Sequence, residues 1–111
     1  MTENVKPIIL TDNETGMEYT LEFTKETVKF AEMHGFEVRD LTRFPMTAGA
    51  NIWFYAFRAH HKNVPRNRTD AMLEEIGGLS DELAQRLGEL YAAPFEVTHE
   101  APENPRMTVK L

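Results

Sequence analysis

The aromatic segment at residues 52–57, Ile-Trp-Phe-Tyr-Ala-Phe, constrains the fold of this chain more than any other part of its sequence. On a helix, Trp53 and Phe57 share one face, whereas Phe54 and Tyr55 point progressively away from it. A small domain easily buries one face of such a helix. Burying most of its circumference requires either a central place in a bundle or a second molecule. Two interpretations are therefore open: a core helix, or a helix that exposes part of its aromatic surface for protein binding.

The N-terminal region has the pattern of a β-hairpin. Residues 7–11 form a short run rich in β-branched side chains, and residues 17–23 alternate between apolar and polar, as in a strand with one buried face. Residues 12–16 between them are turn formers and end in Gly16. Residues 107–111 alternate in the same way and could add a third strand, since two strands alone are only marginally stable.

Helical patterns fill the rest of the chain. Thr24 is predicted to cap a helix over residues 25–34 that Gly35 ends, and a connector follows over residues 37–45. The longest helix is expected over residues 46–62. Two shorter helices should follow. Thr69 is predicted to cap the first, which ends at Gly77-Gly78, and Ser80 is predicted to cap the second, which ends before Pro94.

These elements together predict an α+β fold, in which an N-terminal β-hairpin packs on about four α-helices. Residues 1–93 are predicted to form a single domain, and residues 94–111 a proline-containing C-terminal tail with the candidate terminal strand. The chain has 111 residues, a length that suits one domain.

Composition excludes several kinds of chemistry. The chain contains no cysteine, which rules out disulfides, zinc–thiolate sites and cysteine nucleophiles and favours the reducing cytosol. No apolar run is long enough to span a bilayer, and the first residues lack the pattern of a secretory signal. We therefore expect a cytoplasmic protein without a membrane partner.

A search for catalytic or cofactor sites finds only residues that have ordinary structural roles. His60 and His61 are adjacent, so on a helix they project in different directions and cannot grip one metal ion from one face. Ser80, the one serine in the chain, stands where a helix cap is expected. Glycine-rich phosphate loops are missing as well. The sequence thus predicts a protein that is not an enzyme and that has no cofactor and no metal.

Charge is unevenly distributed along the chain, whose net charge is −6. Residues 41–68 carry five basic and no acidic side chains, whereas both flanks are acidic. This basic segment could pack between the acidic flanks, or it could attract a partner or a second copy of the chain. A platform for single-stranded nucleic acid is a further reading, which the acidic flanks argue against. The candidate partner-binding residues are Trp53, Phe54, Tyr55, Phe57, Arg58, Arg66 and Arg68.

The order of these segments resembles a known family. A hairpin ending in Tyr-Thr-Leu-Glu-Phe at residues 19–23 precedes a capped helix that ends in His34-Gly35-Phe36. A helix then carries Ala-Phe-Arg-Ala-His-His at residues 56–61, and two further helical segments follow at residues 69–76 and 83–91. In this order the chain resembles the small tail assembly chaperones of long-tailed, siphovirus-like bacteriophages and prophages, over about residues 6–91.

The resemblance implies a function. Such chaperones coat the tape measure protein in the cytoplasm of the host bacterium before the tail tube polymerises around it, and they are absent from the mature virion. They have no catalytic residues and no cofactor. The implied partners are the tape measure protein, the tail tube protein for any longer frameshifted product, and further copies of the chain. Two alternatives stay open: another phage structural protein, such as a head–tail connector or tail completion protein, and a small nucleic-acid-binding regulator.

Overall fold

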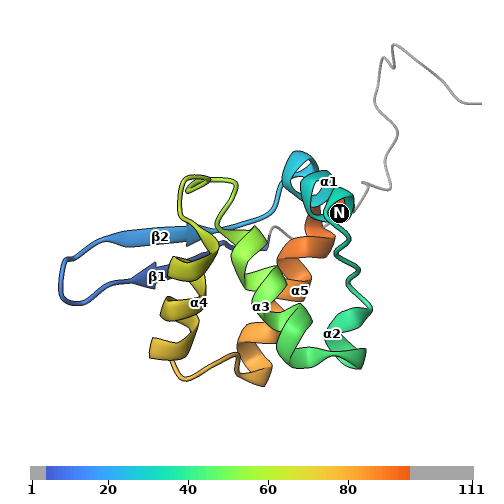
Figure 1. Cartoon of the computed structure of the whole chain (residues 1–111). Coiled ribbons are helices and arrows are strands. Elements are labelled where there is room, and N and C mark those ends of the chain that lie inside the picture. The colour runs from blue at the N-terminus through green and yellow to red at the C-terminus, as the bar shows by residue number, and fades with distance from the viewer. Residues whose placement is uncertain (1–4, 96–111) are drawn as a thin grey trace, which may run out of the picture.

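The structure of the chain is a computed structural model that describes residues 5–95, and it has an α+β fold (Figure 1). A two-stranded antiparallel sheet extends from one side of a group of helices. The elements are β1 (Ile8–Thr11), β2 (Glu18–Leu21), α1 (Lys25–Met33), α2 (Asp40–Arg43), α3 (Pro45–Ala56), α4 (Arg66–Glu75), α5 (Asp81–Ala92) and the 3-10 turn η1 (Ala93–Phe95). The predicted fold class is confirmed, with five α-helices in this part of the chain in place of about four.

The predicted hairpin is present, and its alternation largely holds. β1 and β2 pair with Leu10 opposite Tyr19, and Tyr19 and Leu21 are buried whereas Glu18 is exposed. Gly16 takes a φ of 77°, the left-handed conformation that a tight turn here requires and that glycine adopts without strain. Met17, expected on the buried face, is 47% exposed, because it lies before β2 in the hairpin turn, where its carbonyl accepts a hydrogen bond from the Asp12 N–H at 2.8 Å.

Helix α1 begins and ends as its sequence predicts. The Thr24 hydroxyl accepts a hydrogen bond from the Thr27 N–H at 3.2 Å, and the Thr27 hydroxyl accepts one from the Thr24 N–H at 2.8 Å. This reciprocal capping box satisfies two backbone donors that the helix itself leaves free. At the other end Gly35 has a φ of 86°, and the N–H of buried Phe36 donates to the Ala31 carbonyl at 3.0 Å.

Helix α3 is shorter than predicted, because contacts with the hairpin end it. It stops at Ala56, six residues before the expected end at residue 62, and the following residues form turns. The Ala56 carbonyl accepts a hydrogen bond from the Glu22 N–H at 3.0 Å, just beyond β2. These contacts join residues far apart in the sequence, so the local pattern that predicted a longer helix could not reveal them.

Helices α2 and α4 also differ from the prediction. The expected connector contains the short helix α2, and α4 begins at Arg66, three residues before the predicted cap Thr69. Thr69 is instead buried inside the helix, where its hydroxyl donates to the Arg66 carbonyl at 3.0 Å. Pro65, which has no N–H to leave unsatisfied, occupies the N-cap. The predicted Ser80 cap of α5 is confirmed by a hydrogen bond from the Leu83 N–H at 3.1 Å.

The core is built around α3, which contacts α1, α2, α4 and α5. The largest fully buried side chains of the core are Trp53, Phe57, Leu21, Ile52, Leu87, Leu90, Val28 and Thr69. None of the helices in residues 5–95 combines the length and apolar character needed to cross a membrane. The candidate strand at residues 107–111 lies outside the described residues, as does most of the predicted tail.

Candidate functional site

The aromatic segment that the sequence offers as a binding face lies mostly in the core. Trp53 and Phe57 are each 1% exposed and Tyr55 is 8% exposed. The Trp53 Nε1–H donates to the Thr69 carbonyl oxygen at 2.8 Å, so its one polar atom is satisfied inside the protein. The interpretation of Trp53, Tyr55 and Phe57 as an exposed binding face is therefore wrong, because helices on several sides of α3 cover them. Phe54 is the exception and is half-buried.

The predicted basic site residues Arg58, Arg66 and Arg68 all make contacts within the chain. The Arg58 guanidinium lies 3.5 Å from the centroid of the Phe30 ring, a cation–π geometry. Arg66 donates through Nε to Asp70 Oδ1 at 2.9 Å, and its guanidinium lies 5.5 Å from the Phe54 ring centroid. The Arg66–Asp70 pair favours packing of the basic segment against an acidic flank, whereas Arg58 packs on an aromatic ring.

The two adjacent histidines bind the outer edge of the hairpin. His61 Nε2 accepts a hydrogen bond from the Thr20 N–H at 2.9 Å, and His60 Nε2 lies 2.7 Å from Glu22 Oε1. A backbone N–H can only donate, so His61 Nε2 is the acceptor in this bond. Within residues 5–95, no three His, Asp or Glu side chains gather closely enough to hold a metal ion. The histidines therefore act here as structural partners of β2.

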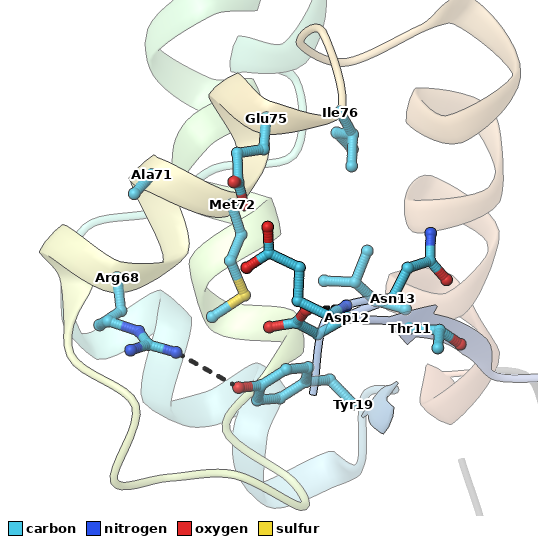
Figure 2. Close-up of a pocket in the computed structure, with 11 residues that line it drawn as sticks. Thr11, Asp12, Asn13, Tyr19, Arg68, Ala71, Met72, Glu75 and Ile76 are labelled. Carbon is cyan, nitrogen blue, oxygen red and sulfur yellow. Dashed lines mark hydrogen bonds between the residues drawn. The ribbon is translucent and has the colours of Figure 1, made fainter. Parts of the chain in front are cut away.

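A different feature, the space between the hairpin and α4, forms a cavity of about 530 Å³ (Figure 2). We call it the hairpin–α4 pocket. Its volume falls within the range of roughly 300–1,000 Å³ that is common for binding sites. It is lined by Leu10, Thr11, Asp12, Asn13, Glu14, Tyr19, Arg68, Ala71, Met72, Glu75 and Ile76.

The α4 contribution to the pocket is one continuous helix face. Its lining residues follow the spacing i, i+3, i+4, i+7, i+8, namely Arg68, Ala71, Met72, Glu75 and Ile76. Positions at this spacing lie on the same side of an α-helix. Thr69, in contrast, is fully buried between α4 and α3. Helix α4 thus covers the core with one side and presents a second side to the pocket.

Charged groups surround the pocket. Arg68 donates to the Tyr19 hydroxyl at 3.4 Å, and Figure 2 shows this guanidinium reaching toward the Tyr19 ring. Asp12 Oδ1 accepts hydrogen bonds from the N–H groups of Glu14 at 2.9 Å and Thr15 at 3.3 Å. These two bonds, the Glu14 bond first, lower the pKa of Asp12 below its ordinary value of 3.8. The Asp12 carboxylate therefore stays ionised across the neutral range, next to the lining acids Glu14 and Glu75.

The pocket also offers apolar surface. Leu10 and Met72 line it beside the Tyr19 ring, and Ile76 is 44% exposed. Apolar and charged side chains occur together in many protein-binding surfaces. Of the predicted site residues only Arg68 belongs to this pocket. The helical spacing of residues 68–76 was visible in the sequence, but its position opposite the turn at residues 12–16 was not.

A second group of exposed apolar side chains lies away from the pocket, at the junction of α2 and α3. Phe44 is 55% exposed and Met46 is 90% exposed. Neither residue lines the hairpin–α4 pocket. The hairpin–α4 pocket has a defined lining from two parts of the chain, so it is the stronger candidate site.

Comparison with other proteins places the chain in a family. Neither the search of curated proteins nor the search of solved structures returned a match. A family described as "Domain of unknown function (DUF5055)" matches residues 1–111, the whole of the sequence. The chain therefore belongs to the DUF5055 family.

Proposed function

We propose that this protein is a non-enzymatic assembly chaperone, and that it binds the tape measure protein of a siphovirus-like phage or prophage in the cytoplasm of the host bacterium. The hairpin–α4 pocket is the observation that supports a binding function most directly, since apolar and charged side chains line it together. The choice of client rests on the resemblance of the segment order to tail assembly chaperones. The aromatic segment gives the proposal little support, because Trp53, Tyr55 and Phe57 are buried and Phe54 is half-buried.

The physical requirement for such a chaperone is modest. It must cover apolar positions on a long helical client and leave a hydrophilic exterior. The net charge of −6 provides that exterior, and exposed Ile76 with half-buried Met72 provides apolar contact surface beside the pocket acids. Coating by several copies, and contact with the tail tube protein through a longer frameshifted product, are further parts of the proposal.

Co-expression tests the proposal. The tape measure protein of the same phage should be found mostly in the insoluble fraction alone and in a soluble complex with this chain. If the tape measure protein is equally insoluble with and without the chain, the proposal fails.

The composition of assembled particles separates the alternatives. A chaperone should be missing from purified virions, whereas a head–tail connector or tail completion protein should be retained in them. A nucleic-acid-binding regulator would instead retain DNA or RNA in a salt-dependent manner and lose it when Arg66 and Arg68 become Ala.

A further inference from the structure

We infer that the hairpin–α4 pocket receives a helical segment of a partner protein in which a ridge of aliphatic side chains is flanked by Lys or Arg. The inference rests on the proposed binding function and specifies the chemistry that its site selects. It identifies residues 68–76 and the turn at residues 12–14 as the contact surface.

The shape of the site favours a helix as the partner. The α4 side of the pocket is a stripe with the spacing of a helix-packing face, and Ala71 in its middle is small and exposed. A small residue at the centre of such a stripe allows a second helix to approach closely, with its side chains entering the grooves between turns. The cavity of about 530 Å³ then accepts the partner's aliphatic side chains against Leu10 and Met72.

The charges of the site favour a basic partner. Three acids line the pocket, Asp12, Glu14 and Glu75, against the single base Arg68. The Arg68 guanidinium is directed to the Tyr19 hydroxyl at 3.4 Å. Because the lining acids outnumber the one lining base, a flanking Lys or Arg on the partner would be attracted to the site, whereas a flanking Glu would be repelled.

The test uses the full chain and three synthetic peptides of about 15 residues, a length at which helices in water are marginal. The first peptide places Leu at helical spacing with Lys on both sides, the second replaces each Lys by Glu, and the third scrambles the first. Binding is measured by fluorescence anisotropy of labelled peptide. We expect the Lys peptide to bind more tightly than the other two, with an affinity that falls as salt is raised.

Charge reversal in the pocket provides the matched comparison. Combining Glu14→Lys with Glu75→Lys should lower the affinity for the Lys peptide by about tenfold or more and raise the affinity for the Glu peptide. Glu74→Lys makes the same charge change as Glu75→Lys alone, one residue away at an exposed position outside the pocket lining, and should weaken binding much less than Glu75→Lys does. Circular dichroism establishes that each variant is folded. Glu75→Gln removes the negative charge without adding a positive one, so it should lower the affinity for the Lys peptide less than Glu75→Lys does.

The outcomes separate this inference from the proposed function. Equal effects of Glu74→Lys and Glu75→Lys would overturn the inference, as would a free protein that forms dimers through this pocket. If the chain solubilises the tape measure protein but the unsubstituted chain binds all three peptides alike, the inference fails and the proposed function stands. If the pocket selects the Lys peptide but the tape measure protein stays insoluble, the inference stands and the proposed client is wrong.

Discussion

Replacement of Trp53 by Ala tests whether the aromatic helix is part of the core. The side chain is 1% exposed, its Nε1–H donates to the Thr69 carbonyl, and its ring centroid lies 5.4 Å from that of Phe57. Truncating a fully buried Trp costs about 3–5 kcal/mol of unfolding free energy. A domain of this size has a total stability of roughly 5–15 kcal/mol, so the loss is a large share of it. We expect the melting temperature to fall by roughly 4–8 °C for each kcal/mol lost.

Phe54→Ala is the matched control on the same helix. Phe54 is only half-buried, beneath the Arg66 guanidinium, so its loss should cost about 1 kcal/mol. Urea denaturation followed by far-ultraviolet circular dichroism measures both variants, because Trp53 is the one tryptophan and its fluorescence is lost on substitution. A Trp53→Ala protein as stable as Phe54→Ala would refute the packing described here.

Two further predictions concern glycine and pH. Gly35→Ala should destabilise the protein by about 1–2 kcal/mol, because Gly35 has a φ of 86°. Gly88 lies inside α5 with open space around an added Cβ, so Gly88→Ala should stabilise the protein by about 0.5–1 kcal/mol. Thermal unfolding measures both variants, and equal changes in melting temperature for Gly35→Ala and Gly88→Ala would contradict this reasoning. Because the pKa of Asp12 is lowered in the folded protein, its contribution to stability is present above pH 3.8 and is lost as pH falls through the folded pKa. An NMR titration should therefore find Asp12 protonating below its ordinary value, and a value above it would contradict the turn geometry.

Local sequence patterns predicted the elements whose ends are determined locally. The hairpin follows from alternation around Gly16, and α1 follows from the Thr24 cap and Gly35. Each signal acts within a few residues, so the surrounding protein did not have to be known.

Elements that depend on distant contacts were predicted less well. Helix α3 ends early where Ala56 meets Glu22 of the hairpin, and Thr69 is drawn into the core beneath Trp53 instead of capping α4. Dependence on distant contacts also explains why the aromatic helix was wrongly predicted as a possible binding face. A helix with rings around its circumference suits both a central core helix and a binding helix, and only the packing of neighbouring helices distinguishes the two.

The hairpin–α4 pocket was not predicted, because its two walls come from residues 10–19 and 68–76. Arg68 was selected as part of a basic segment, yet it contacts Tyr19 and shares the pocket with Asp12 and Glu14 of the hairpin. Sequence spacing along α4 shows which side chains share a face, but it cannot show what lies opposite that face.

Amide NMR of the full chain, titrated with the Lys-flanked helical peptide, tests most directly whether the hairpin–α4 pocket is the binding surface. We expect the largest shifts at residues 11–14 and 68–76, with the indole N–H of Trp53 almost unmoved. Largest shifts at Phe44 and Met46, with the pocket residues unchanged, would place binding at the α2–α3 junction and contradict the central claim.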